Sequence, residues 1–126
     1  MGSRATGAQA GFDNIVTMDI GGTSFDVGVI VSGKPIMRTE IAVAGADIRV
    51  HSIDVESIGA GGGSIAYVEF GELRVGPRSA GANPGPACYG RGGTRPTATD
   101  ADLVLGVLDP DNFIGGRMKL DVEAAR

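Results

Sequence analysis

The chain has 126 residues, a formal net charge of −4 and a single cysteine. Its length suits one domain, and its acidic balance argues against a nucleic-acid-binding protein, which needs a basic face. The lone Cys88 excludes an internal disulfide and a zinc site made of several cysteines. Because the sequence contains neither an apolar run of the ~18 residues that cross a bilayer nor a signal-peptide pattern, we expect a cytoplasmic protein without membrane or nucleic-acid partners.

Glycine is the unusual feature of the composition. There are 22 glycines in 126 residues, roughly 17% against an average near 7%. Hydrophobic residues still make up 42% of the chain, whereas aromatic residues make up only 5%. This combination predicts a folded protein with many tight turns around a thin core of small aliphatic side chains, and therefore weak stability of the chain on its own.

The first half of the chain is expected to consist of strands, because its apolar residues run continuously or alternate and each run is ended by glycine or polar residues. The expected strands cover residues 14–20, 25–31, 34–43 and 48–58. The first two flank Gly21-Gly22 and should form a hairpin. Residues 1–11 are expected to be an N-terminal tail, of which residues 1–4 are not expected to form structure, ahead of one partial domain over residues 12–126.

The second half begins with a glycine loop over Gly59–Ser64. Apolar runs on either side of Gly71-Glu72 then predict a second hairpin between residues 65 and 76. Residues 77–96 are rich in proline and glycine but also carry tyrosine, cysteine and arginine. This mixture predicts an ordered loop rather than a linker.

One clear helix is expected to begin near residues 97–99, with Thr99 as its cap and Asp100 at its positive end. Its apolar stripe comprises Leu103, Val104, Val107 and Leu108. Asp109-Pro110 should end it. Residues 121–126 resemble the start of a further helix, which suggests a segment of a longer protein, since so short a helix does not form alone in water.

The first motif with chemical meaning runs from Asp19 to Asp26. A carboxylate ends an apolar strand, two glycines and two hydroxyl side chains follow, and a second carboxylate lies on the next strand. Glycine N–H groups can approach a phosphate, hydroxyls add donors, and a carboxylate can hold hydrated Mg²⁺. The candidate residues are Asp19, Gly21, Gly22, Thr23, Ser24 and Asp26. An ordinary Gly-Gly hairpin would show the same pattern, and both interpretations stay open at this point.

The second motif is the glycine loop that ends in Gly61, Gly62, Gly63 and Ser64. It is not a P-loop, because no Gly-Lys-Ser/Thr follows, and it does not fit the dinucleotide fingerprint. Its glycines require positive φ angles or a close approach of backbone. A flexible turn is the alternative to a ligand-facing loop.

The other polar groups point less clearly to chemistry. His51, Asp54 and Glu56 do not share one strand face, so we do not expect a three-ligand metal site from them. Cys88 is expected to be a buried, inert thiol rather than a nucleophile. The Arg74–Arg95 segment carries four arginines and no acid, and it is either a solvated loop or a site for an anion or an acidic partner.

Three stretches of the sequence resemble the hydantoinase A/5-oxoprolinase family. They are DIGGTSFDVGVI at residues 19–30, IGAGGGSIAYV at 58–68 and LRVGPRSAGANPGPACYGRGGTRPTATDADLVLGVLDPDNFIGG at 73–116. The resemblance covers roughly residues 12 to 126. It implies the actin-like ATPase fold, so we expect an α+β chain, strand-rich, that forms a partial ribonuclease-H-like lobe with one clear helix.

The resemblance also implies a chemistry. Members of the family hydrolyse ATP to open cyclic amides such as hydantoins and 5-oxoproline, related ketone carboxylases use ATP to activate their substrates, and many members work with a B-type partner subunit. By position, Asp19 would assist Mg²⁺ or orient water, while Gly21, Gly22, Thr23 and Ser24 would hold ATP phosphates. Gly61, Gly62, Gly63 and Ser64 match a second family loop that faces a ligand or an interface.

The family has another Asp-Gly-Gly-Thr loop nearer its N-terminus and an adenosine loop nearer its C-terminus, and this sequence contains neither. We therefore expect the chain to supply one phosphate-binding loop of an ATP-dependent cyclic-amide hydrolase whose remaining parts lie elsewhere in a parent chain. Two alternatives are a segment of an ATP-dependent ketone carboxylase and, for the isolated chain, an inactive binding or assembly module.

Overall fold

The computed structural model describes residues 2–43 and 45–126. The chain divides into two compact units, although we expected a single domain. The first unit comprises the chain up to Asp19 together with Asp26–Ile58, and the second comprises Ile20–Phe25 together with Gly59–Arg126. The hairpin loop that carries the first motif thus belongs to the second unit.

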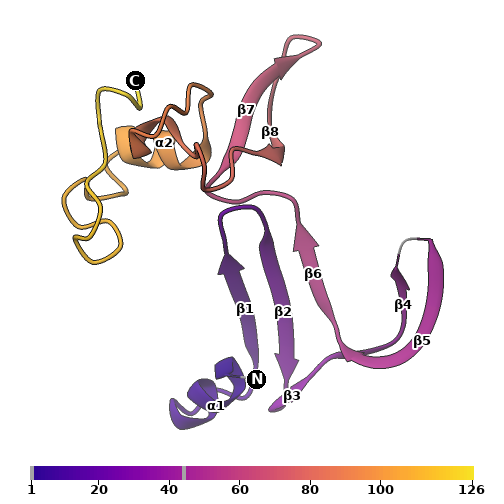
Figure 1. The fold of residues 1–126 in the computed structure, drawn as a ribbon. Helices are drawn as coiled ribbons and strands as arrows, with labels where there is room; N and C mark the ends of the chain where they lie inside the picture. Colours follow the sequence, from indigo (N-terminus) through magenta and orange to yellow (C-terminus); the bar gives the residue numbers. More distant parts are fainter. Residues whose placement is uncertain (1, 44) are drawn as a thin grey trace. The chain divides into compact units, whose positions relative to one another are not determined.

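The first unit is built mostly from strands, as expected (Figure 1). Its elements are α1 (Gly2–Gln9), β1 (Ile15–Ile20), β2 (Phe25–Val31), β3 (Lys34–Pro35), β4 (Met37–Val43), β5 (Ala46–Ile53) and β6 (Val55–Ile58). Strand β2 pairs with β1, β3 and β6 in a four-stranded sheet, and β4 and β5 form a two-stranded antiparallel sheet. The expected hairpin of residues 14–20 and 25–31 is confirmed.

Two of the expected strands are each divided in two. Residues 34–43 form β3 and β4, with Ile36 between them, whose N–H donates to the carbonyl of Val29 on β2 at 3.0 Å. Residues 48–58 form β5 and β6, separated by Asp54, whose N–H donates to the carbonyl of Ile36 at 2.8 Å. The chain therefore leaves one sheet and joins another at these two points.

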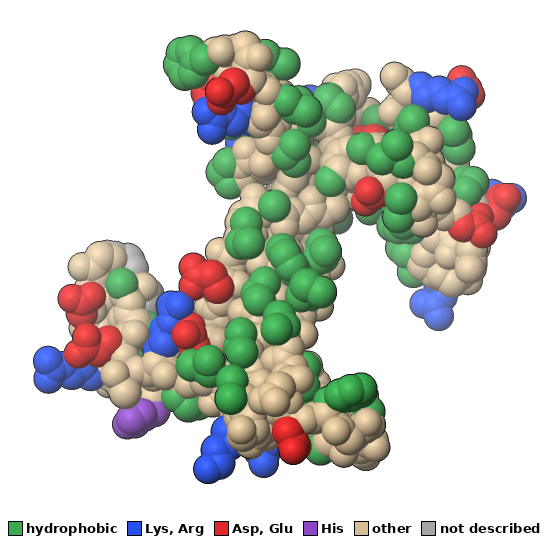
Figure 2. All heavy atoms as spheres, turned by 180° about the vertical axis from the view of Figure 1, so that it is seen from behind, with side chains coloured by type: hydrophobic (Ala, Val, Ile, Leu, Met, Phe, Trp, Pro, Cys, Tyr) green, Lys and Arg blue, Asp and Glu red, His purple; other side chains and the backbone are tan. Residues whose placement is uncertain are grey.

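Residues 2–9 of the expected N-terminal tail form α1, so the expectation that residues 1–4 lack structure is wrong for residues 2–4. The helix packs closely on the sheet at Gly7, where a Cβ would lie 2.2 Å from Cδ1 of Ile15. Among the described residues of the first unit, Ile30 is the one buried large hydrophobic side chain, while Met18 on β1 is 71% exposed. Figure 2 shows many hydrophobic side chains at the surface, in agreement with the thin core that the composition predicts.

The second unit combines a hairpin, a helix and long loops. Its elements are β7 (Ser64–Glu69), β8 (Glu72–Ser79), the short 3₁₀ helix η1 (Ala87–Tyr89) and α2 (Ala98–Val104). The β7–β8 hairpin is confirmed, with Glu69 opposite Glu72. Its core consists of Cys88, Leu103 and Leu120, packed against rings and aliphatic side chains from the C-terminal loops. None of the described helices could span a membrane.

Helix α2 differs from its prediction at both ends. Its cap is Thr97 and not Thr99, and Thr97 forms a reciprocal capping box with Asp100. The helix ends at Val104, before Val107 and Leu108, because the chain turns at Gly106, whose φ is +76°. Residues 122–125 form a turn rather than a further helix.

Candidate functional site

The candidate site starts from the tight turn between β1 and β2, here called the first glycine loop (Gly21–Ser24). The N–H of Gly21 donates to the carbonyl of Ser24 at 2.8 Å, which closes the turn. A Cβ at Gly22 would meet no heavy atom within 4 Å. Within the described residues, no hydrogen bond is donated by the amides of Gly22 and Thr23. The loop thus contains two backbone amides that have no acceptor among the described residues, and such loop amides can bind an anion.

The second glycine loop (Gly59–Ser64) fixes the position of the first. Gly62 N–H donates to the carbonyl of Gly21 at 3.0 Å, and Gly63 N–H donates to the carbonyl of Gly22 at 2.7 Å. These two bonds use carbonyl oxygens of the first glycine loop and do not engage the amides of Gly22 and Thr23. The structure therefore brings together two sequence motifs that lie 40 residues apart, with the second loop hydrogen-bonded to the first.

Glycine is required in the second loop because the two backbones approach closely. A Cβ at Gly61 would lie 2.6 Å from the carbonyl oxygen of Gly21 and 2.7 Å from the nitrogen of Thr23. A Cβ at Gly63 would lie 2.8 Å from the carbonyl oxygen of Gly22. Real Cβ atoms do not tolerate such distances to backbone atoms. The backbone that packs against these two glycines is therefore that of the first glycine loop, not that of a ligand.

Ser64 completes the support. Its side chain is fully buried, its Oγ accepts from Gly61 N–H at 2.8 Å, and its own N–H donates to the carbonyl of Gly61 at 2.9 Å. The amides of Gly61, Gly62, Gly63 and Ser64 are thus all used within the chain. The ligand-facing role of this loop stays a prediction, whereas its geometry makes it the support of the first glycine loop.

A hollow of about 320 Å³ lies beside the two loops, entirely within the second unit. Its walls comprise Ile20, Gly21, Gly22, Gly62, Gly63, Gly81, Pro86, Tyr89, Thr99, Asp102, Leu108 and Phe113. The rings of Tyr89 and Phe113 are 5.6 Å apart and form part of the apolar side. Its volume is at the lower end of the range typical of small-molecule sites.

Helix α2 holds the second glycine loop through Thr99, a contact that the sequence interpretation missed. The N–H and the hydroxyl of Thr99 both donate to the carbonyl of Gly62, at 2.8 and 2.7 Å. A hydroxyl residue at the start of a helix is typical of a cap, so the sequence pattern does not indicate that Thr99 bonds a distant loop. It instead ties the first turn of α2 to the loop that supports the candidate site.

Asp100 is the buried charge behind this site, with a relative exposure of 2%. Its carboxylate accepts from the N–H of Cys88 at 2.8 Å, and from the N–H and hydroxyl of Thr97 at 3.0 and 2.8 Å. Burial by itself would raise the pKa of Asp100, but these hydrogen bonds more than offset it and lower the pKa below its ordinary value of 3.8. The carboxylate is therefore charged at neutral pH and joins η1 to α2.

Cys88 is fully buried beside Asp100, as expected of an inert thiol. Burial, and then its interaction with Asp100, raise the pKa of Cys88 from 9.0 to about 12. We expect alkylation by iodoacetamide at pH 8 to be about a thousand-fold slower in the folded chain than in urea, because thiolate is the reacting form. Mass spectrometry of timed samples measures both rates.

A thiol introduced by Ser3→Cys on the exposed surface of α1 provides an internal control in the same chain. It should react at the rate of an unfolded cysteine with or without urea. Equal native rates at the two positions would contradict the inert, buried state of Cys88.

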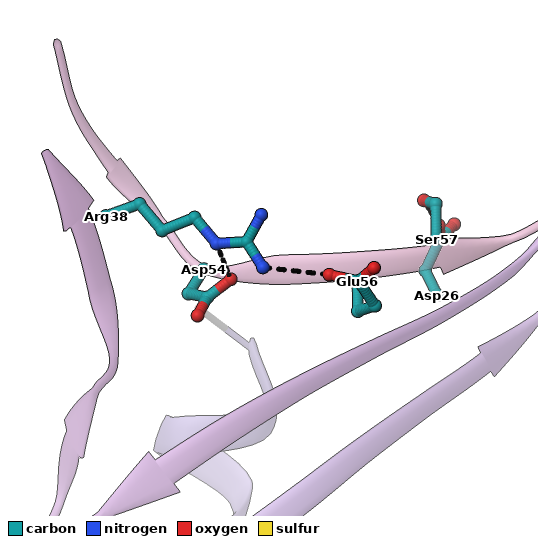
Figure 3. Close-up of polar contacts among 5 residues, drawn as sticks. All are labelled: Asp26, Arg38, Asp54, Glu56 and Ser57. Atoms are coloured by element: carbon teal, nitrogen blue, oxygen red, sulfur yellow. Dashed lines mark hydrogen bonds and ion pairs between the residues drawn. The ribbon is translucent and has the colours of Figure 1, made fainter. Parts of the chain in front are cut away.

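The two carboxylates of the first motif belong to the first unit. Asp19 is exposed near the end of β1, two residues before Gly21 in the chain. Asp26, on β2, accepts a hydrogen bond from the hydroxyl of Ser57 on β6, as Figure 3 shows. Asp26 is thus engaged by a neighbouring strand, and its predicted contact with a ligand stays a prediction.

The residues around His51 form an ion-pair network rather than a metal site. Arg38 pairs with both Asp54 and Glu56 (Figure 3), and its Nη2 lies 2.8 Å from Oε2 of Glu56. His51 is exposed and supplies the single purple side chain in Figure 2. No group of three metal-ligating side chains occurs in the part of the chain that the structure describes.

Three of the four arginines of the Arg74–Arg95 segment have partners in their own unit. Arg74 pairs with Glu72 at 3.2 Å. The guanidinium groups of Arg78 and Arg91 each lie 5.9 Å from the centre of a tyrosine ring, over Tyr67 and Tyr89 respectively. These contacts order the segment, and its role toward an anion or a partner stays a prediction.

The sequence model of the hydantoinase/oxoprolinase family matches residues 1–126, the whole chain. The chain belongs to the hydantoinase/oxoprolinase family. It is 51% identical over 116 residues to the caprolactamase subunit alpha of Pseudomonas jessenii, covering 91% of this chain and 17% of that protein. It is 48% identical over 124 residues to the acetophenone carboxylase gamma subunit of Aromatoleum aromaticum, covering 96% of this chain and 17% of that protein.

A solved structure confirms the fold of this family member. Acetone carboxylase in a nucleotide-free state superposes with a TM-score of 0.86 at 35% identity, covering 98% of this chain and 18% of the solved one. The strand-rich α+β class is therefore established, with two helices rather than the one expected. The chain spans less than a fifth of the length of these relatives.

Proposed function

We propose that the chain forms part of an ATP-dependent enzyme that opens cyclic amides, and that its first glycine loop contacts ATP phosphates. The observation that carries this proposal is the pair of amides at Gly22 and Thr23 that donate to no described residue, in a loop that the second glycine loop holds in place. The similar caprolactamase is described as ATP-dependent. These relatives are much longer than this chain, so residues outside it can supply the other walls of a nucleotide site.

The residues present suit a polyphosphate and its metal. The amides of Gly22 and Thr23 donate to no described residue, and the hydroxyls of Thr23 and Ser24 could add donors. The space beside the Cβ position of Gly22 is open. Asp19 supplies a carboxylate two residues away in the chain, and Mg²⁺ needs only one or two carboxylates beside phosphate and water. ATP, when bound, would supply the phosphoryl group that activates an amide carbonyl oxygen and makes it a better leaving group. The protein's part is to orient those phosphates and to hold Mg²⁺ or a water at Asp19.

Asp19→Asn in the complete protein tests this proposal. We expect lactam-dependent ATP hydrolysis to fall at least about a hundred-fold, because a neutral amide neither balances the charge of Mg²⁺ nor accepts a proton from water. Initial rates of phosphate release at saturating ATP, Mg²⁺ and lactam measure the effect.

Asp47→Asn is the matched control, since it removes a carboxylate that is also exposed, on β5. It should leave the rate unchanged. ATP hydrolysis by the Asp19→Asn variant at the control rate would remove Asp19 from the mechanism.

Ketone carboxylation is the second candidate, favoured by the similarity to acetophenone carboxylase and by the superposition on acetone carboxylase. A carboxylase consumes ATP in the presence of a ketone and bicarbonate, whereas a cyclic-amide hydrolase consumes ATP with a lactam. ATP consumption measured with each substrate distinguishes them. The names of the relatives identify them as subunits, so we also propose a B-type partner subunit.

A further inference from the structure

The lining of the hollow beside the glycine loops is chemically mixed. Leu108, Phe113 and Tyr89 contribute apolar surface. The two loops contribute backbone, and the half-buried Asp102 of α2 is the single charged residue among the described lining residues. The side chain of Asp102 accepts no hydrogen bond from the described residues, unlike that of Asp100 two positions before it.

The charge of the hollow indicates which ligand it suits. None of the described residues that line it is lysine, arginine or histidine. A polyphosphate placed inside would meet a carboxylate and an apolar wall without a compensating cation, which is unfavourable. A small neutral ring would instead bury apolar surface against Leu108 and Phe113, while a polar N–H group on that ring would satisfy the carboxylate.

We propose that the hollow binds the cyclic amide itself, with the amide N–H donating to the carboxylate of Asp102. The carbonyl oxygen, on the neighbouring atom of the ring, would then face the first glycine loop, where the proposed function places the ATP phosphates. This inference rests on that function. The proton stays on nitrogen, and its hydrogen bond to a carboxylate increases the electron density of the carbonyl oxygen that receives the phosphoryl group.

The arrangement also selects between the two substrate classes. A ketone of similar size has a carbonyl oxygen but no N–H, so it would leave the carboxylate of Asp102 desolvated and unpaired. A site that hydrogen-bonds a substrate N–H discriminates against analogues that lack it. Asp102 thereby becomes a residue that determines specificity for amides over ketones.

Calorimetric titration of the complete protein with ε-caprolactam and with N-methylcaprolactam, both without ATP, tests this inference. The unsubstituted lactam should bind about tenfold more tightly to the wild type. Asp102→Ala should weaken its binding about tenfold and leave the N-methyl lactam unchanged. Asp102→Asn, which keeps an acceptor oxygen, should restore most of the affinity, and thermal unfolding checks that each variant is folded.

A purely steric effect of the methyl group would persist in Asp102→Ala, whereas a lost hydrogen bond would not. Equal binding of caprolactam by the wild type and by Asp102→Ala would overturn the inference, as would the absence of lactam binding to the wild type. The proposed function could fail while this inference holds. In that case the lactam would bind with the expected dependence on Asp102 but would not stimulate ATP hydrolysis.

Discussion

Replacing Asp100 by asparagine should lower the free energy of unfolding by about 3 kcal/mol, since hydrogen bonds to a buried charged group contribute more than neutral ones. The carboxylate accepts from Cys88 and Thr97 and is almost inaccessible to water. Asparagine keeps one acceptor oxygen but turns an NH₂ group toward backbone N–H donors. At least one of these donors then remains buried without a partner.

Urea denaturation followed by far-ultraviolet circular dichroism measures this loss. Asp102→Asn is the matched control, because it removes a charge from the same helix at a side chain without a hydrogen bond from the described residues. Its midpoint should stay close to that of the wild type. Equal midpoints for the Asp100 and Asp102 variants would contradict the role of Asp100 in joining η1 to α2.

The same carboxylate gives this prediction a pH dependence. The pKa of Asp100 is lower in the folded chain than in the unfolded one, so its contribution is complete above the unfolded pKa of about 3.9 and is lost as the pH falls through the folded value. The stability difference between wild type and Asp100→Asn should therefore be constant from pH 7 to about pH 5 and decrease below about pH 4. A stability difference between the two proteins that increases below about pH 4 would contradict a lowered pKa of Asp100 in the folded chain.

The features predicted correctly from sequence are those that neighbouring residues decide. Gly21-Gly22 and Gly71-Glu72 interrupt apolar runs, and hairpins form at both places. The capping box was also available, because Thr97 and Asp100 have the required spacing, but Thr99 was preferred as the cap. Here the signal existed and was outweighed by a neighbouring residue of the same type.

The features that could not be predicted depend on residues far apart in the chain. The donors to Asp100 include Cys88, twelve positions earlier, and no local pattern joins them. The supporting role of Gly61 and Gly63 depends on carbonyl groups about 40 residues earlier in the chain. The local pattern, four glycines among six residues, is equally typical of a loop that faces a ligand. The ligand chemistry of the site depended on the family resemblance, since a glycine hairpin alone is too common to identify it.

Gly61→Ala separates support of the first glycine loop from contact with a ligand. The new Cβ would lie 2.6 Å from the carbonyl oxygen of Gly21 and 2.7 Å from the nitrogen of Thr23, both backbone atoms that cannot move away as a side chain would. We expect the free energy of unfolding to fall by about 2–3 kcal/mol, as for an overpacked core. ATP hydrolysis by the complete protein should fall at least about tenfold, because the amides of Gly22 and Thr23 are displaced from their positions. Thermal unfolding and steady-state phosphate release measure the two effects.

Gly22→Ala is the matched control, with the same change on the open side of the loop. A Cβ there meets no heavy atom within 4 Å, so the unfolding temperature should not change. If phosphates approach this side, the added methyl group should still weaken ATP hydrolysis, and activity would be lost without any loss of stability. The two glycines would then be required for different reasons, Gly61 because backbone packs against it and Gly22 because a ligand does. An unfolding temperature for Gly61→Ala equal to that of Gly22→Ala would show that the second glycine loop does not hold the first in place.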